Sequence, residues 1–338
     1  MTFNKYSKYG NSGFILSKNF SLFLWVILLI FSGCEAPRDN PLDPSNPNNE
    51  KKGTIEGTVQ SFSLPYKGIS DVKVFWAAGN VFVTTDTAGS FIILNVEPVD
   101  GSLIFEKQGY TADTVNVVWK NSKSLNYIVN LNQLPVLDSI AIYTSVINNA
   151  SQPQNFELTI IAKISDPDKN IDSVYVSNSF LNLNSGLGYN LTDKVYQTSL
   201  SIDSLGISDL EQTIGLDFQI NVIDNFNKTH NIGSGKVTRV IKNEVQLTSP
   251  AGGSTVDTLP RFSWQKFDAG YTYTYMLEVF TNNLANAQLV FRAENLPSDS
   301  LSYTTKKPIA QGEYYWVVWA VDRFKNRSRS KPLIFKVQ

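Results

Sequence analysis

The chain has 338 residues, with 29 basic and 30 acidic side chains, one histidine and one cysteine. A formal net charge of −1 without a basic stripe argues against nucleic acid as a partner. One histidine and one cysteine exclude a histidine-rich zinc site and an internal disulfide.

The first 33 residues have the pattern of a secretory signal peptide. They contain Lys5, Lys8 and Lys18 and no acidic residue, and an apolar run follows at 20–31 (FSLFLWVILLIF). A basic start, an apolar stretch of about 7–15 residues and then small residues is typical of such signals. A transmembrane helix needs about 20 apolar residues, so this run is short for a membrane anchor by itself. Removing residues 1–33 changes the formal net charge from −1 to −4.

The signal ends at the only cysteine of the chain. The residues Phe31-Ser32-Gly33-Cys34 resemble the lipobox of bacterial lipoproteins, with Phe31 where that family usually has leucine. The resemblance implies that Cys34 is lipidated and becomes the mature amino terminus. It predicts an exported bacterial lipoprotein, placed in the outer membrane, on either its periplasmic or its surface-facing side. An ordinary signal peptide, or an uncleaved membrane segment that ends near a cysteine, is the alternative.

The segment that follows the cysteine has the composition of a tether. Residues 35–52 (EAPRDNPLDPSNPNNEKK) hold four prolines, four asparagines and almost no apolar side chains. Such a segment cannot bury enough surface to fold. We therefore predict a lipidated cysteine and a disordered, solvated tether at 34–52, where the lipid chains supply a membrane anchor.

The rest of the chain predicts an all-β protein built of tandem β-sandwich domains. Short alternating segments rich in Val, Ile, Thr, Tyr and Phe recur between Gly, Asn, Asp and Pro residues, and long helical periodicity is absent. About 300 mature residues are enough for two or three ordinary cores. We place the domains at 53–133, 134–242 and 243–338.

The first domain has strand-length runs and a tight turn at 86–89 in which Gly89 supplies backbone freedom. Its residues resemble the carboxypeptidase regulatory-like domain, a transthyretin-like sandwich. The resemblance rests on Gly57-Thr58-Val59, Gly68 with Val72 and Val74, Thr84-Thr85-Asp86 before Gly89 and Phe91, and Gly109-Tyr110. That family has no active site of its own, so the resemblance implies a structural or binding accessory related to carbohydrate-binding sandwiches.

The second domain resembles the Ig-like modules of bacterial surface proteins, which often carry a DPD corner after the second strand. Asp166, Asp168 and Asp172 are weak calcium candidates, because one corner supplies few ligands and lacks the glycine and distal glutamate of an EF-hand loop. A turn capped by aspartate side chains is the favoured alternative. His230, in the polar stretch NKTHN, is predicted to be an exposed loop residue.

The third domain resembles a bacterial fibronectin type III domain. The resemblance rests on Ser249-Pro250, Pro260 with Phe262 and Trp264, Gly312 with Tyr314-Tyr315-Trp316, and Ala320-Val321-Asp322 before Asn326 and Ser328. With Ala320 inward as in that family, strand alternation sorts the remaining positions. The inward set is then Tyr275, Leu277, Val279, Tyr314, Trp316, Val318, Leu333, Phe335 and Val337.

The outward positions of the same strands form the candidate contact site. If the strands are neighbours, one outer face carries Met276, Phe280, Tyr315, Val317, Trp319 and Ile334. An apolar face of this size predicts a partner surface. Burial against the second domain is the alternative, and a face-on glycan platform is a further one.

The sequence therefore predicts a non-catalytic lipoprotein that presents sandwich modules to a protein or glycan partner. A structural scaffold or spacer in an envelope complex is the alternative. A Ser-His-Asp triad would have to use His230, no free thiol remains once Cys34 is lipidated, and no phosphate-binding loop motif occurs. A glycosidase-like carboxylate pair is compatible with the composition but needs a cleft. We predict no catalytic residue and no cofactor.

Overall fold

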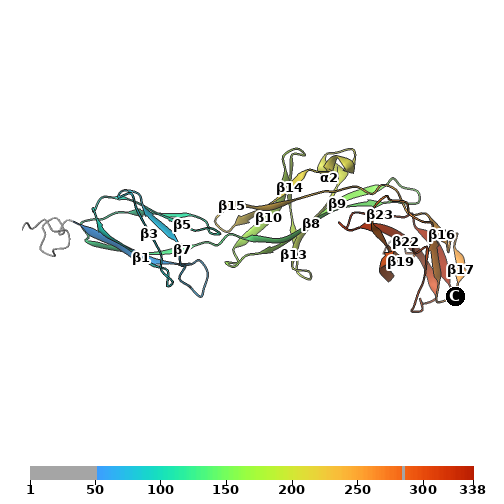
Figure 1. Cartoon of the computed structure of the whole chain (residues 1–338). Coiled ribbons are helices and arrows are strands. Elements are labelled where there is room, and N and C mark those ends of the chain that lie inside the picture. Colours follow the sequence, from blue (N-terminus) through green and yellow to red (C-terminus); the bar gives the residue numbers. More distant parts are fainter. Residues whose placement is uncertain (1–51, 284–285) are drawn as a thin grey trace, which may run out of the picture. The chain divides into compact units, whose positions relative to one another are not determined.

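The computed structural model describes residues 52–283 and 286–338. The chain folds into two compact units. Of the described residues, unit 1 comprises 52–60, 68–106 and 112–129, and unit 2 comprises 61–67, 107–111, 130–283 and 286–338. Almost every element is a strand, which confirms the prediction of an all-β chain of tandem sandwiches (Figure 1). The predicted signal peptide, Cys34 and all but the last residue of the predicted tether lie outside the described residues.

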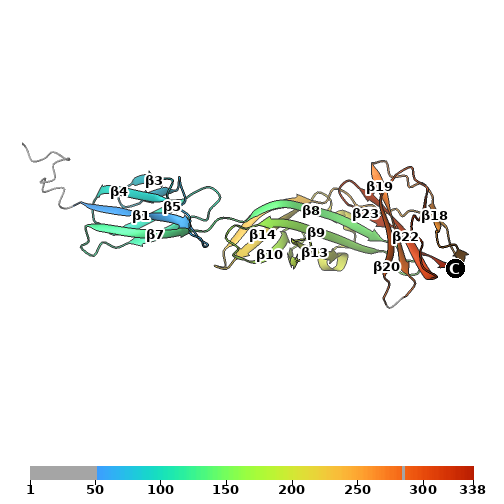
Figure 2. The same cartoon turned by 90° about the horizontal axis from the view of Figure 1, so that it is seen from below.

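The first sandwich packs a three-stranded sheet, β4-β1-β7, against a four-stranded sheet, β3-β2-β5-β6 (Figure 2). Alternate residues of the strands face inward, and Val59, Val74, Trp76, Leu103 and Phe105 are fully buried. The strands are β1 (Gly53–Ser61), β2 (Lys73–Trp76), β3 (Val81–Thr84), β4 (Ser90–Val96), β5 (Gly101–Glu106), β6 (Asp113–Val117) and β7 (Ser124–Leu131).

The second sandwich pairs the sheet β11-β10-β14-β15 with strands β12, β13, β9 and β8. Its core includes Leu158, Ile160, Val176, Phe218 and Ile220, all fully buried. Its elements are β8 (Val136–Ile147), β9 (Asn155–Ser165), β10 (Ile171–Asn178), β11 (Leu183–Gly186), β12 (Gly188–Asn190), β13 (Val195–Ser201), α2 (Ile202–Leu205), the 3₁₀ turn η1 (Leu210–Thr213), β14 (Asp217–Asp224) and β15 (Thr229–Lys236).

The third sandwich packs β16-β18-β21 against β22 and its neighbours β19, β20, β23 and β24, and β24 also pairs with β17. Its strands are β16 (Leu247–Ser249), β17 (Ser254–Val256), β18 (Arg261–Trp264), β19 (Tyr273–Thr281), β20 (Leu289–Pro297), β21 (Ser302–Thr304), β22 (Gly312–Asp322), β23 (Arg327–Arg329) and β24 (Leu333–Val337).

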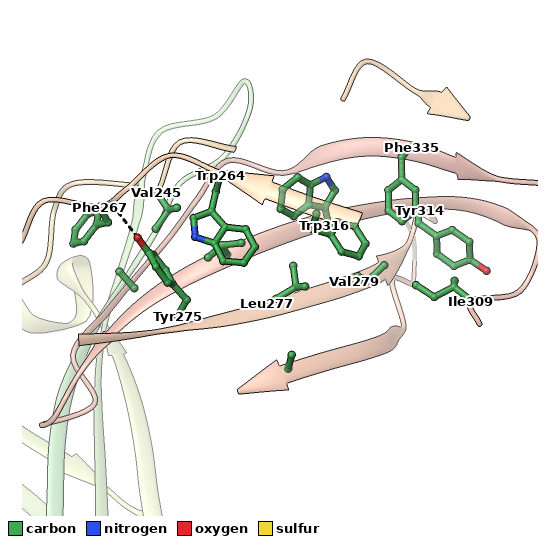
Figure 3. Close-up of a cluster of buried hydrophobic side chains, with 14 of the residues drawn as sticks. Val245, Trp264, Phe267, Tyr275, Leu277, Val279, Ile309, Tyr314, Trp316 and Phe335 are labelled. Atoms are coloured by element: carbon green, nitrogen blue, oxygen red, sulfur yellow. Dashed lines mark hydrogen bonds between the residues drawn. The ribbon is translucent and has the colours of Figure 1, made fainter. Parts of the chain in front are cut away.

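The core of the third sandwich is rich in aromatic rings (Figure 3). Every residue predicted to face inward belongs to this core or packs against it, which confirms the alternation. Two of its polar groups are hydrogen-bonded: the Trp316 indole donates to the Pro250 carbonyl at 2.8 Å, and the Tyr275 hydroxyl accepts the Phe267 amide at 2.9 Å.

Four tight turns repeat one design, in which an aspartate carboxylate accepts the backbone N–H groups two and four residues ahead. The aspartates are Asp86, Asp166, Asp224 and Asp322, and these bonds span 2.7–3.1 Å. The residue three positions ahead has a positive φ in each turn: 78° at Gly89, 54° at Lys169, 59° at Asn227 and 72° at Lys325. A positive φ is unfavourable for residues other than glycine and asparagine. The bonds from the aspartate side chain stabilise the turn in spite of this cost where the residue is lysine.

The second and third sandwiches share one ten-stranded sheet. The short strand β23 pairs in parallel with the end of β8, with Arg327 opposite Ser145 and Arg329 opposite Ile147. The Asn326 side chain accepts the Thr144 amide at 3.0 Å and donates to the Thr238 hydroxyl at 3.0 Å. Backbone and buried side-chain bonds therefore fix the joint between these two sandwiches.

Candidate functional site

The outer face of the third sandwich lies over β19, β22 and β24, as predicted. Met276 is opposite Trp319, Phe280 is opposite Tyr315, and Tyr315 is also opposite Ile334. Residues directly opposite in antiparallel strands have neighbouring side chains on one face of the sheet. The register therefore brings these predicted residues together on one face, but their environments divide the face into two parts.

The first part, the covered half, consists of Val317 and Trp319 with the charged side chains around them. Val317 is fully buried, and Trp319 is 7% exposed. The Trp319 indole donates to Glu278 Oε2 at 2.7 Å, and the Arg292 guanidinium bonds Glu278 Oε1 at 2.6 Å. The Arg327 guanidinium lies 4.7 Å from the Trp319 ring centre. The sequence predicted an open apolar face, and here the structure differs because charged side chains cover the rings.

Arg329 connects the covered half to the second sandwich. Its Nη2 donates to the Asn148 carbonyl at 3.2 Å and to Asn149 Oδ1 at 3.1 Å. Burial lowers the pKa of the Arg329 guanidinium below its ordinary value, and the nearby Tyr315 and Glu278 oppose that shift. Arg329 thus links this half of the face to the second sandwich by hydrogen bonds, while the side chains that cover Trp319 belong to the third sandwich itself.

The second part, the open row, consists of Leu289, Phe280, Tyr315 and Ile334 on four successive strands, β20, β19, β22 and β24. Leu289 is 43% exposed and Ile334 is 45% exposed, and the two rings between them are half-buried. The Phe280 and Tyr315 rings are stacked, with centroids 5.1 Å apart and planes 13° from parallel. Since adjacent strands lie about 4.8 Å apart, opposed rings in this arrangement stand upright on the sheet. They present edges outward, which suits a protein surface better than the flat stacking of a sugar.

The residues that cover the face were not predicted from the sequence; they are Glu278, Arg292, Arg327 and Arg329. The alternation already pointed to Glu278, since it occupies the outward position between Met276 and Phe280. The three arginines had no comparable signal, because their positions depend on which strands pair beside β19 and β22.

The aspartate corner of the second sandwich is a capped turn. The two carboxylate oxygens of Asp166 accept the amides of Asp168 and Asn170, and an oxygen of Asp168 accepts the Gln133 amide at 2.6 Å. Asp172 is exposed on β10. The described residues contain no group of three or more histidine, cysteine or acidic side chains arranged to hold a metal ion.

The prediction of an exposed loop for His230 is wrong. His230 lies on β15 with its side chain 12% exposed, and its Nε2 is 2.9 Å from Oδ2 of Asp224, whose side chain is 1% exposed. Burial alone would raise the pKa of Asp224, but hydrogen bonds from His230 and from the Lys228 and Phe226 amides outweigh burial and lower it. Asn132 also donates to Asp224, so the carboxylate of this turn is a structural acceptor.

Comparisons with known proteins place the chain at the level of fold. It matches no protein-family profile and no curated protein. Among solved structures, chicken CNTN1 FN1–FN3 domains align with a TM-score of 0.30 and 10% identity, covering 85% of this chain and 96% of that one. Clostridium thermocellum CbhA fibronectin(III)-like modules align with a TM-score of 0.28 and 13% identity, covering 60% of this chain and 93% of that one. Bacteroides ovatus SGBP-B, solved in complex with a mixed-linkage heptasaccharide, aligns with a TM-score of 0.21 and 12% identity, covering 83% of this chain and 66% of that one.

Within residues 52–283 and 286–338, no helix is both long enough and apolar enough to cross a bilayer.

Proposed function

We propose that this protein is an exported, non-catalytic lipoprotein that presents its sandwiches for binding a protein partner. The observation that carries the proposal is the open row, four apolar side chains that cross four adjacent strands at the surface. Contiguous exposed apolar side chains on a sheet favour a protein interface. The upright ring pair favours protein over glycan, because each ring already has one face against the other ring.

The anchoring part of the proposal rests on Cys34. This cysteine ends a basic and apolar segment and precedes 18 residues, rich in proline, asparagine and charged side chains, that lead into β1. A multiply acylated cysteine would hold the folded domains at a membrane, since each buried methylene contributes about 0.8 kcal/mol.

The covered half takes a supporting part in this function. Val317 is fully buried and Trp319 lies beneath charged side chains, so neither offers apolar surface to a partner. Their cover, through Arg327 and Arg329, ties the face to the second sandwich. The open row is therefore held on a rigid support, which lowers the entropic cost of binding.

A scaffold or spacer function is the second candidate, and the joint between the second and third sandwiches favours it. A shared sheet with buried polar contacts on both sides of β23 resists bending more than a plain linker does. A spacer needs this stiffness, whereas an adhesive module does not.

Photo-crosslinking in intact cells tests the binding proposal. A photoreactive phenylalanine replaces Tyr315 in one variant and Tyr189 in a matched control, where Tyr189 is an exposed β12 tyrosine. We expect one defined protein adduct from position 315 and none from position 189. Equal labelling, or no adduct at position 315, would favour the spacer function.

Membrane fractionation tests the anchor separately. We expect the native protein in the membrane fraction and the Cys34→Ser variant in the soluble or unprocessed fraction. Protease treatment of intact cells then distinguishes a surface-facing protein, which is digested, from a periplasmic one, which is protected. A native protein that fractionates as soluble would contradict the anchor.

A further inference from the structure

The end of the first sandwich at which β1 begins is a compact tip made of three chain segments. They are the start of β1, the β4–β5 loop at 97–100 and the β6–β7 loop at 118–123. The Thr54 amide donates to the Lys123 carbonyl at 3.0 Å, and the Trp119 amide donates to Asp100 Oδ1 at 2.9 Å. These bonds fix the two loops against β1.

Trp119 lies beneath this tip and packs closely on the chain entrance. A side chain at position 53 would place its Cβ 2.3 Å from the Trp119 ring, so only glycine fits there. Trp119 is 98% buried, and its Nε1 has no hydrogen-bond partner among the described residues. A cleft of about 320 Å³ opens here, lined by Lys52, Gly53, Pro98, Trp119, Asn121, Ser122 and Lys123.

The surface of the tip combines ammonium groups with apolar side chains. Lys52, Lys120 and Lys123 are exposed, and so are Val99 and Val118. The acidic groups of the same segments are Glu97 and Asp100, and Asp100 is engaged by the Trp119 amide. Three lysines thus outnumber two carboxylates at the tip. The two exposed valines beside them would be stabilised by burial against a partner or a membrane.

The position of the tip along the chain identifies its occupant. Eighteen residues, 35–52, separate the proposed acylated cysteine from β1. Fully extended, they span at most about 65 Å, so the anchor keeps the start of β1 within that distance of the bilayer. Since β1 begins at the tip, the anchor limits the distance between the tip and the membrane more tightly than it limits that of any other part of the first sandwich.

We propose that this tip docks on anionic phospholipid headgroups. The inference rests on the proposed function, because it takes the acylated Cys34 as the source of proximity. Ammonium groups of Lys52, Lys120 and Lys123 pair with headgroup phosphates, while Val99 and Val118 enter the interfacial layer. Docking of this kind is weak alone and becomes effective when the anchor raises the local concentration of lipid. It would fix the orientation of the first sandwich on the membrane.

Vesicle flotation of the chain from residue 35 onward tests the proposal. This form keeps every described residue and lacks both the acyl chain and the apolar signal. We expect it to float with vesicles of phosphatidylcholine and phosphatidylglycerol and not with pure phosphatidylcholine, and to be released as salt screens the charges. Lys120→Glu with Lys123→Glu should weaken flotation at least about tenfold, since each lysine near an anionic surface contributes about 1 kcal/mol.

Lys306→Glu with Lys307→Glu is the matched control, because this exposed pair makes the same charge change on the third sandwich. Unchanged near-ultraviolet circular dichroism shows that each variant is folded, and Val99→Ser, which leaves the charge unchanged, should also weaken flotation. Equal loss in both lysine pairs, or no binding to the anionic vesicles, would overturn the tip as a docking site. If inorganic phosphate at constant ionic strength releases the protein from the vesicles, the ligand of the tip is free phosphate and not the membrane.

The proposal for the anchor and the proposal for the tip are tested by different experiments. Loss of membrane fractionation in the Cys34→Ser variant reports on the anchor. Flotation of the unacylated chain reports on the tip.

Discussion

The covered half and the open row start from the same sequence pattern and reach different environments. In both, β22 places an aromatic residue opposite a β19 residue, Trp319 opposite Met276 and Tyr315 opposite Phe280. The difference arises from the other neighbour of β22, which is β24 along 312–316 and β23 along 319–321. β23 brings two arginines and the connection to β8, whereas β24 brings Ile334. The neighbouring strand thus decides whether an outward residue is surface or interior.

The largest effect is expected from Trp319→Ala. The change removes a buried ring that two guanidinium groups cover, and it leaves Glu278 Oε2 without its indole donor. We expect a loss of about 3–5 kcal/mol in the free energy of unfolding, as for a buried aromatic residue. Urea denaturation of this variant and of Tyr315→Ala, each compared with the native protein, measures the loss. Equal losses in the two variants would remove the distinction between the halves.

Asn326→Ala tests whether the joint maintains the cover. It leaves the buried Thr144 amide without an acceptor, at a cost of about 1–3 kcal/mol. Ser90→Ala is the control, because Ser90 is exposed and occupies the same position in the turn at Asp86. We expect the NMR signal of the Trp319 indole N–H, assigned by its absence from Trp319→Phe, to shift in Asn326→Ala before global unfolding. A native spectrum under conditions where the protein is still folded would show that the cover over Trp319 does not depend on the joint.

Glu278→Gln sharpens the electrostatic part of the comparison. Glutamine keeps an acceptor for the Trp319 indole and loses the charge that faces Arg292, so we expect a loss of about 1.5 kcal/mol. A double-mutant cycle with Arg292→Gln should give a coupling of about 0.5–1 kcal/mol, because the guanidinium is partly exposed. Zero coupling would mean that Glu278 acts only as the acceptor for Trp319.

Tyr315→Ala should have the smallest effect on stability. The ring is half-buried and loses its stacking with Phe280, which together amount to about 1 kcal/mol. Partner capture, in contrast, should be lost. Thermal denaturation and crosslinking from position 334 in the same variant measure the two quantities. A large loss of stability with capture intact would assign the open row to the structure and not to binding.

Strand alternation predicted the core and the outward set of the third sandwich, because the period of two depends only on local backbone geometry. It did not predict the cover of Trp319, which comes from β23, a three-residue strand whose parallel partner lies 182 residues earlier in the chain. The prediction for His230 was wrong for a local reason, because its partner Asp224 lies only six residues earlier, on the paired strand β14. Its neighbours in NKTHN are polar, but the carboxylate of Asp224 gives it a place on β15.

The parallel pairing of β23 with β8 bears on how such chains are rearranged during evolution. A break at 242/243 would separate these strands, leave the end of β8 as an unpaired edge and expose the amide of Thr144. A gene rearrangement that moved the third sandwich alone would therefore lose these contacts. We expect the second and third sandwiches to fold well only when they are expressed together.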